Sequence, residues 1–265
     1  MTVGVDSAPS CSRHALEAGT SRYLATLSTG ELGWLQTILA ENATYSENLI
    51  QTDMKHSTLS QTVRIDYKRT TVDKVQCATY TELLATDAKN PLMIATQIRF
   101  DAQGSKITKV DSIVTTNGDL LFNATHALHY FLADDWTPIP ASKRDDRQTL
   151  QAAADSYFDI FVNKSVVVPW GKPCLRIEGG FLDANGTCET DIPDITVLTK
   201  DRRYVIDESI GSVNIVSNFG ILGPDSHEFR ILGGKIHSIH TMTLCRPNLN
   251  CGLAPPEQLS QDVGF

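Results

Sequence analysis

An internal repeat limits the folds open to this chain. Residues 104–113 (GSKITKVDSI) match residues 233–242 (GGKIHSIHTM), where a Gly and Lys turn enters a strand with apolar residues at the same three positions. Upstream, residues 45–48 (YSEN) align with 176–179 (RIEG), and the amphipathic segments 21–27 and 156–161 come before them in the same order. Self-similarity at one spacing is the signature of a duplicated unit. The 265 residues therefore predict two copies of a unit of about 130 residues.

Each copy places helical patterns before strand patterns. We expect helices at 14–27 and 31–40 in the first copy and at 147–161 in the second, where apolar residues recur at helical spacing. The segments with strand character follow the helices in both copies: 63–67, 76–83, 92–100 and 106–115, then 166–170, 203–206, 213–219, 227–232 and 235–244. Helices followed by a run of antiparallel strands predict an α+β fold.

The expected domain boundaries follow from the repeat. The first unit covers residues 12–135 and the second covers 147–246, with a linker at 136–146 and a C-terminal tail at 247–265. The linker contains two prolines and a cluster of charges, as exposed domain boundaries commonly do.

The six cysteines predict disulfides. No C-x-x-C pair occurs, which argues against a zinc or thioredoxin-type motif. Short spacings favour the pairs Cys174–Cys188 and Cys245–Cys251, which leaves Cys11 and Cys77 as the third pair. Six cysteines allow 15 connectivities, so this pairing rests on proximity alone. The alternative is six buried thiols in a cytosolic protein.

Glycosylation sequons favour the disulfide interpretation. Asn-x-Ser/Thr occurs at Asn42, Asn123, Asn163 and Asn185, whereas composition alone predicts about two such sites. Disulfides and sequons together indicate the secretory pathway or an extracellular location. The segment after Met1 has no apolar core of a signal peptide, so we interpret the chain as a mature form whose leader has been removed.

Composition excludes two classes of partner. The chain has 23 basic and 31 acidic residues, a net charge of −8, and no basic stripe of the kind that nucleic-acid binding requires. Its apolar runs are only a few residues long, far below the ~20 residues needed to cross a bilayer. We therefore expect a small-molecule partner, with neither nucleic acid nor membrane, and a homodimer stays open as an assembly state.

The second copy carries motifs that resemble a known family. The run CLRIEGG at 174–180, Cys188, the run DRRYVIDESIG at 201–211 and the Gly-Lys-Ile strand look like a family of fungal two-repeat proteins, often secreted. Helices before a strongly curved sheet resemble the cone-shaped NTF2-like (SnoaL-like) fold. The resemblance implies two tandem NTF2-like units. Some NTF2-like and fungal biosynthetic proteins act as cofactor-free cyclases or isomerases on polyketides and meroterpenoids. The chain is also similar in size and class to fungal hetero-Diels–Alderases of tropolone sesquiterpenoid biosynthesis.

Cofactor motifs are missing from the sequence. There is no G-x-G-x-x-G after a strand, no P-loop, no H-E-x-x-H and no G-x-S-x-G. His237 and His240 lie three apart on an expected strand and so point to opposite faces, which disfavours a metal site there. We expect no cofactor and no metal.

Two carboxylate-containing pairs are the candidate catalytic residues. Arg176 and Glu178 lie at i and i+2, so both point to one face of an extended segment. They could orient a polar substrate or act as acid and base. The alternative is a structural salt bridge beside the Cys174–Cys188 loop. Tyr45 and Glu47 are the equivalent pair in the first copy.

A second group of residues is expected to bind substrate. Arg203 and Asp207 share one strand face, where they could line a cavity mouth or could instead join the two copies through ion pairs. The remaining candidates are conspicuous aromatic and histidine side chains that could equally be ordinary packing: Trp170, His240, His129 and Tyr130.

Two functions fit these features. The first is a cofactor-free cyclase or pericyclase, with an intermolecular hetero-Diels–Alder cycloaddition as one form, acting on a polyketide or terpenoid intermediate. The second is a secreted small-molecule-binding protein without catalytic activity. The sequence does not separate them.

Overall fold

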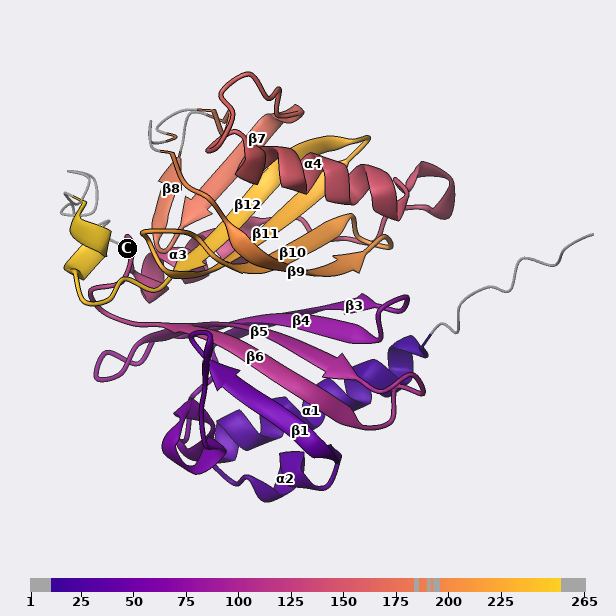
Figure 1. The fold of residues 1–265 in the computed structure, drawn as a ribbon, viewed down its shortest axis with the longest axis vertical. Helices are drawn as coiled ribbons and strands as arrows, with labels where there is room; N and C mark the ends of the chain where they lie inside the picture. Colours follow the sequence, from indigo (N-terminus) through magenta and orange to yellow (C-terminus); the bar gives the residue numbers. More distant parts are fainter. Residues whose placement is uncertain (1–10, 184–185, 190–191, 193–195, 254–265) are drawn as a thin grey trace, which may run out of the picture.

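The computed structural model describes residues 11–183, 186–189, 192 and 196–253. Two units follow one another along the chain, and each packs one long helix, α1 or α4, on one six-stranded sheet (Figure 1). Unit 1 is residues 13–115 and consists of α1 (Arg13–Thr29), α2 (Gly33–Gln36), β1 (Leu39–Glu47), β2 (Ile50–Gln51), β3 (Tyr67–Asp73), β4 (Ala78–Ala85), β5 (Leu92–Phe100) and β6 (Ile107–Thr115). Unit 2 is residues 147–243 and consists of α4 (Arg147–Asp159), β7 (Trp170–Glu178), β8 (Phe181–Asp183), β9 (Lys200–Asp207), β10 (Ser212–Asn218), β11 (Pro224–Leu232) and β12 (Lys235–Thr243).

The two sheets have the same topology. Their strand orders are β2-β1-β6-β5-β4-β3 and β8-β7-β12-β11-β10-β9, so each strand of unit 1 has one counterpart in unit 2. In both sheets one pair is parallel, β1 with β6 and β7 with β12, and the other pairs are antiparallel. Tyr45 lies opposite Val110 in the first parallel pair, as Arg176 lies opposite Ile239 in the second. The predicted α+β class with two tandem helix-plus-sheet units is therefore confirmed.

Three expected elements differ from the structure. The helix expected at 31–40 is only the four residues of α2, and the chain enters β1 at Leu39. The apolar residues of 31–40 pack instead against the core that α1 forms with its sheet. The strand expected at 63–67 begins at Tyr67, because the backbone N–H of Val63 donates to Leu27 at the end of α1. The strand expected at 166–170 begins at Trp170, directly after a proline that cannot donate to a ladder.

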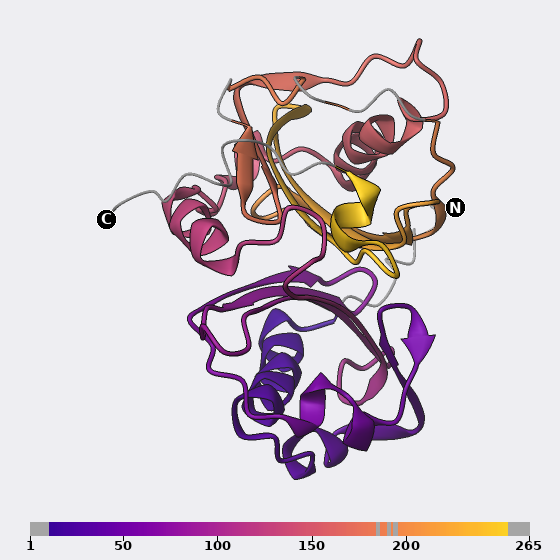
Figure 2. The ribbon, with the colours of Figure 1, turned by 90° about the vertical axis from the view of Figure 1, so that its left-hand side faces the viewer.

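Three cores hold the molecule together. In each unit the helix packs on the concave face of its sheet, with Tyr23 of α1 and Tyr157 of α4 both buried there. A third core, which includes Tyr80, Met93 and Met242, lies between the two sheets. The sheets therefore pack back to back, with α1 and α4 on the outer sides (Figures 1 and 2).

Helix α3 (Ala124–Ala133) follows unit 1 and covers one edge of this third core (Figure 2). Ala127 and Phe131 are buried within it. Asn123 caps the helix and lies so close to Gly180 that a Cβ there would lie 2.4 Å from the Asn123 Cβ. The histidine-rich helix is thus held by packing between the units.

A reciprocal pair of buried aspartates joins the units. Asp73, at the end of β3, accepts hydrogen bonds from Arg147 of unit 2 (2.6 and 2.9 Å) and from the backbone N–H of Ile206 (3.0 Å). Asp207, at the equivalent end of β9, accepts from Arg13 of unit 1 (2.8 and 2.9 Å) and from the N–H of Val72 (2.9 Å). The interaction is therefore made twice, once in each direction, as a two-fold pseudosymmetry requires.

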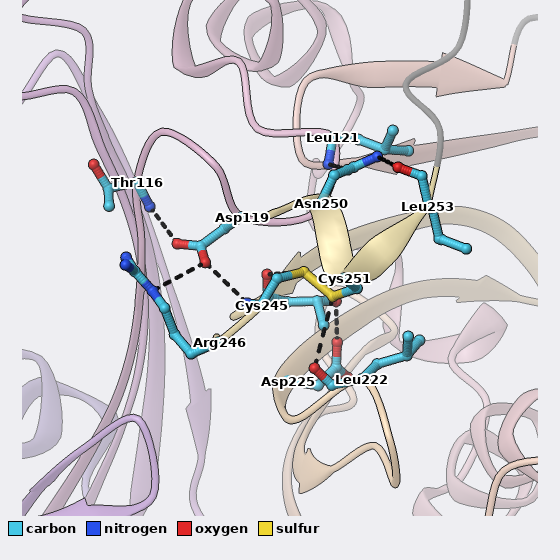
Figure 3. Close-up of a disulfide and its surroundings, with 11 residues drawn as sticks. Thr116, Asp119, Leu121, Leu222, Asp225, Cys245, Arg246, Asn250, Cys251 and Leu253 are labelled. Atoms are coloured by element: carbon cyan, nitrogen blue, oxygen red, sulfur yellow. Dashed lines mark hydrogen bonds and ion pairs between the residues drawn. A yellow bond between two sulfur atoms is a disulfide. The ribbon is translucent and has the colours of Figure 1, made fainter. Parts of the chain in front are cut away.

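The three predicted disulfides are confirmed. Cys11–Cys77 ties the start of α1 to the turn before β4, and Cys174–Cys188 closes the segment after β8 onto β7. Cys245–Cys251 holds the chain after β12, where the N–H of Cys245 donates to Asp119 at 2.9 Å (Figure 3). Within the described residues, no helix is both long and apolar enough to cross a membrane.

Candidate functional site

The concave face of unit 2 collects the ionisable residues of that unit's interior. Arg176 and Glu178 point into it from β7, Asp225 and His227 from β11, and Tyr157 from α4. Their surroundings are aromatic. His227 is stacked on Phe219 and Phe229 and has its edge against Phe158, with ring centroids 5.0–5.9 Å apart. Charged and polar groups are thus set among aromatic rings in the interior of unit 2.

Arg176 is the charged centre of this face. Its side chain is only 2% exposed, and its Nε lies 3.5 Å from Glu178 Oε1. Nη2 lies 4.0 Å from Asp183 Oδ2 on β8, and the Tyr157 hydroxyl lies near the guanidinium. Burial opposes the charged form, but Glu178 and Tyr157 outweigh it and raise the pKa of Arg176. The predicted pair is therefore brought together, and Arg176 stays cationic.

Asp225 and His227 form a hydrogen-bonded pair on β11, which is separated from the Arg176 strand by β12. His227 Nδ1 lies 2.5 Å from Asp225 Oδ2, and Thr243 Oγ1 donates to Asp225 Oδ1 at 2.6 Å. Asp225 is fully buried and His227 is 4% exposed. The His227 and Tyr157 rings are 5.2 Å apart, and Tyr157 also contacts Arg176. Tyr157 therefore links the two charged pairs.

The equivalent positions of unit 1 are mostly neutral. Where unit 2 has His227 opposite Thr241, unit 1 has Thr96 opposite Ser112. Thr96 bonds to Ser112 at 2.9 Å and to the hydroxyl of Tyr23 at 2.7 Å, so these hydroxyls satisfy one another. Burial raises the pKa of Tyr23 to about 12, which keeps this hydroxyl neutral.

The hydrogen bonds of the Tyr45–Glu47 pair are formed within unit 1. The Tyr45 hydroxyl donates to Glu47 at 2.8 Å, and both the N–H and the hydroxyl of Thr58 also donate to Glu47, at 3.0 and 3.1 Å. Burial raises the pKa of Tyr45. This pair lies on the concave face of unit 1, separated from Arg176 by both sheets. The two members of each predicted pair are thus in contact, but the two pairs lie in different units.

His240 belongs to a buried ionic cluster between the sheets. This inter-sheet cluster consists of Arg69, Glu82, Asp134, Glu228 and His240. Arg69 pairs with Glu82 and donates to Glu228 at 2.7 and 3.0 Å. The imidazole lies 2.9 Å from Glu82 and 3.1 Å from Asp134, and the Phe131 ring stacks on it. Every member of the cluster is bonded to another.

Burial and the neighbouring charges act in opposite directions on the pKa values of the cluster. Burial alone would lower the pKa of His240, but Glu82 and Asp134 raise it to about 9. Burial likewise works to raise the pKa of Glu82, yet Arg69 and His240 bring it below its usual value. Burial dominates at Glu228 and raises its pKa.

A metal ion does not fit this cluster well. One ligand atom from each of Glu82, Glu228 and His240 lies within 4.8 Å of the others, which is close enough for a shared ion. However, Arg69 already lies against both carboxylates, and both imidazole nitrogens are within hydrogen-bond distance of carboxylates. A cation would have to displace a guanidinium. We assign the cluster as an ion-pair network between the units.

His240 should make the free energy of unfolding depend on pH. Its pKa in the folded protein is about 9, above the ordinary value of 6.5. Its contribution to the free energy of unfolding is therefore complete below about pH 6.5 and disappears as the pH rises through about 9. The contribution is on the order of 3 kcal/mol. Urea unfolding between pH 6 and 10 should show the wild type losing stability relative to His240→Gln. Parallel curves for the two proteins would contradict the prediction.

Arg203 and Asp207 lie on the other side of the sheet from Arg176. Arg203 Nε is 3.6 Å from Asp111 of unit 1, and Asp207 binds Arg13. The structure therefore places them at the interface between the units rather than at a mouth on the concave face. The sequence left two interpretations open, and these contacts agree with the one in which ion pairs join the two copies.

The other predicted binding residues are dispersed. Trp170 is half-buried at the start of β7 and has its edge toward Tyr157, so it adjoins the concave face of unit 2. On α3, His129 is exposed and Tyr130 is half-buried against the inter-sheet core. Trp170 is thus the predicted binding residue that lies near Arg176.

The sequons are placed at different depths. Asn42 and Asn163 are exposed, whereas Asn123 is half-buried as the cap of α3. Asn185 lies outside the described residues.

Sequence reasoning missed most of the polar residues around Arg176. Asp225 and His227 are two apart on a predicted strand, the same i and i+2 signal that identified Arg176 and Glu178. Arg69, Glu82 and Glu228 gave no such signal, because Arg69 and Glu82 meet across the β3–β4 pair and Glu228 joins them only after the two sheets pack.

Comparisons with known proteins add the following. A family model described as a domain of unknown function (DUF8021) matches residues 143–243, a range that contains all of unit 2. PrhC from Penicillium brasilianum NBRC 6234 is similar in structure, with 10% identity over 46% of this chain and 89% of its own, and a TM-score of 0.31. An NTF2-like protein of unknown function from Shewanella baltica OS155 has 8% identity over 39% of this chain and 94% of its own, with a TM-score of 0.29. Both scores are low, so nothing about chemistry follows from them. No curated protein matches the chain.

Proposed function

We propose that this protein is a cofactor-independent enzyme of the cyclase or isomerase kind, and that its site is the concave face of unit 2. One observation carries the proposal. Arg176, Glu178, Asp225 and His227 gather among aromatic rings there, whereas equivalent positions in unit 1 are neutral or closed. A duplicated fold needs no such charges for stability, because unit 1 closes the same core without an arginine or a histidine at these places.

The chemistry follows from the residues present. Arg176 supplies fixed donors for an oxygen that gains negative charge during the reaction, and the low dielectric of the site strengthens that interaction. The aromatic walls suit an apolar or aromatic substrate and hold its reacting parts in register, which lowers the entropic part of the barrier. Tyr157 and Glu178 position the guanidinium.

The finer proposal is a fungal secondary-metabolite enzyme that acts on a polyketide or terpenoid intermediate, with hetero-Diels–Alder cycloaddition as its most specific form. The CLRIEGG and DRRYVIDESIG runs support the fungal part of this proposal, because they resemble a family of fungal two-repeat proteins. The cycloaddition is supported by similarity in size and class to fungal hetero-Diels–Alderases. The three disulfides and the sequons support a secretory or extracellular location.

A second candidate is a secreted binding protein that holds a small molecule without converting it. The aromatic surroundings of Tyr157 suit an apolar ligand just as well. Five rings form them: Phe158, Phe161, Trp170, His227 and Phe229.

A mass measurement separates these functions. The purified protein is incubated with a metabolite extract of its source organism, and the products are analysed by liquid chromatography and mass spectrometry. A cyclase or isomerase gives a new peak at an unchanged mass, and a cycloaddition gives a peak at the sum of two masses. Heat-unfolded protein is the control. Co-elution of an unchanged compound with the protein, without any product, would end the enzyme proposal and leave the binding function.

A further inference from the structure

We propose that His227 and Asp225 form a proton-transfer dyad that ionises an enol or phenol hydroxyl of the substrate. This inference rests on the proposed function, because it uses the same concave face, and it names the substrate class. The dyad and Arg176 would have different roles in one proton transfer. His227 receives the proton, and Arg176 stabilises the oxyanion that remains.

The orientation of His227 supports a base at Nε2. Its Nδ1 lies 2.5 Å from Asp225 Oδ2, and a carboxylate can only accept, so the Nδ1 proton points to Asp225. With that proton on Nδ1, the acceptor position of the imidazole is Nε2. Among the residues that the structure describes, none forms a hydrogen bond with this Nε2. The ring is stacked between Phe219 and Phe229, which fixes the direction of the lone pair.

Asp225 is itself held in place. Thr243 Oγ1 donates to its other oxygen at 2.6 Å, and the carboxylate is fully buried. An anchored carboxylate fixes the tautomer of the imidazole and stabilises the imidazolium that forms when Nε2 takes a proton. Asp225 and Thr243 are therefore positioning residues.

The charges of the product state are also compensated. When the substrate O–H bond breaks, its proton forms an N–H bond at Nε2 and its electron pair stays on oxygen. The imidazolium then faces Asp225, and the oxyanion faces Arg176, with Tyr157 in contact with both residues. Return of the proton to carbon or oxygen of the product restores the dyad, so no oxidant or reductant is needed. Tautomerisation of this kind can start a cyclisation or an isomerisation.

The substrate class follows from this pairing. A neutral apolar hydrocarbon has no proton for Nε2 and no oxygen for Arg176. A carboxylic acid is already ionised at neutral pH and needs no base. An enol or phenol needs both groups, because its proton is held too tightly to leave without a base and a cation.

The test uses 4-nitrophenol as the probe, because its phenolate and phenol forms absorb at different wavelengths. At a pH about one unit below the probe's own pKa, the wild type should bind it as the phenolate. His227→Gln and Asp225→Asn should bind it as the neutral phenol. His56→Gln, at an 82% exposed histidine of unit 1, is the matched control and should behave as the wild type. Thermal unfolding checks that each variant is folded.

The outcomes distinguish this inference from the proposed function. If the probe binds in its neutral form to the wild type, or as the phenolate to folded His227→Gln and Asp225→Asn, the dyad is overturned while the site stands. If the wild type does not bind the probe at all, the dyad and the site fall together. Binding that Arg176→Met leaves unchanged would remove Arg176 from the site but not His227.

A measurement on the wild type keeps the inference testable even if the variants do not fold. Proton–nitrogen spectra of the histidine side chains should show a proton on Nδ1 of His227, as on Nδ1 of His237, which donates to the Pro173 carbonyl oxygen. Of these two imidazoles, only His227 should shift its Nε2 resonance when 4-nitrophenol is added. Spectra in which His227 carries its proton on Nε2 would overturn the dyad.

Discussion

Replacing Arg69 with methionine should destabilise the protein by about 3–5 kcal/mol, because two buried carboxylates would lose their shared cation. Arg69 pairs with Glu82 of its own sheet and with Glu228 of the other sheet, and both carboxylates are fully buried. The Trp136 ring lies 3.6 Å from the guanidinium and covers it from solvent. Urea unfolding monitored by tryptophan fluorescence measures the loss as a lower midpoint.

The matched control is Arg64→Met. Arg64 pairs with Asp66 at 3.0 Å, but its side chain is 72% exposed, so the loss should be at most about 1 kcal/mol. A triple variant that also carries Glu82→Gln and Glu228→Gln should recover part of the stability, since no uncompensated carboxylate remains. Equal effects of Arg64→Met and Arg69→Met would contradict the assignment of the cluster.

The architecture was predictable because local signals agree with it. The repeat at 104–113 and 233–242 marks the same central strand of each sheet, β6 and β12, and the alternation of apolar residues sets the face that packs on the helix. Short cysteine spacings gave two disulfides directly. The predicted bounds of a strand were wrong where apolar residues are buried for another reason. Val63, for example, is buried under α1 but does not belong to a strand.

The site was only half predictable. Arg176 and Glu178 lie two apart on one strand, so their contact is local and the sequence contains it. Which side of the sheet becomes the interior is a tertiary property, and for this reason Arg203, Asp207 and His240 could not be separated from Arg176 in advance. The face on which these three residues lie is covered by the other sheet, and their charged groups form ion pairs that join the two units.

The duplication explains how one unit could become a site. Back-to-back packing buries the same sheet face in both units, and the reciprocal Asp73 and Asp207 contacts stabilise it from both sides. With that interface supplied by the chain itself, the concave faces are free to diverge. Unit 1 has hydroxyl groups at Thr96 and Ser112, whereas unit 2 has a histidine paired with an aspartate.

That divergence makes a prediction with a large expected effect. If unit 2 holds the site, Arg176→Met should lower kcat by about 10²–10³-fold, the usual cost of removing one well-placed oxyanion donor. Tyr45→Phe, at the equivalent position of unit 1, removes one hydrogen bond to Glu47 and should leave kcat within about twofold of the wild type. Turnover of the compound identified by mass spectrometry provides the assay.

Protein stability must be separated from catalysis in this comparison. Arg176 is buried beside Glu178 and Asp183, so its removal also destabilises unit 2. Arg176→Lys keeps the positive charge but not the forked donors, and we expect it to fold better than Arg176→Met while regaining only part of the activity. Activity is therefore measured well below the unfolding temperature of each variant. If Tyr45→Phe abolished turnover while folded Arg176→Met retained it, the site would have to be moved to unit 1, where Glu47 and Thr58 would need a catalytic role.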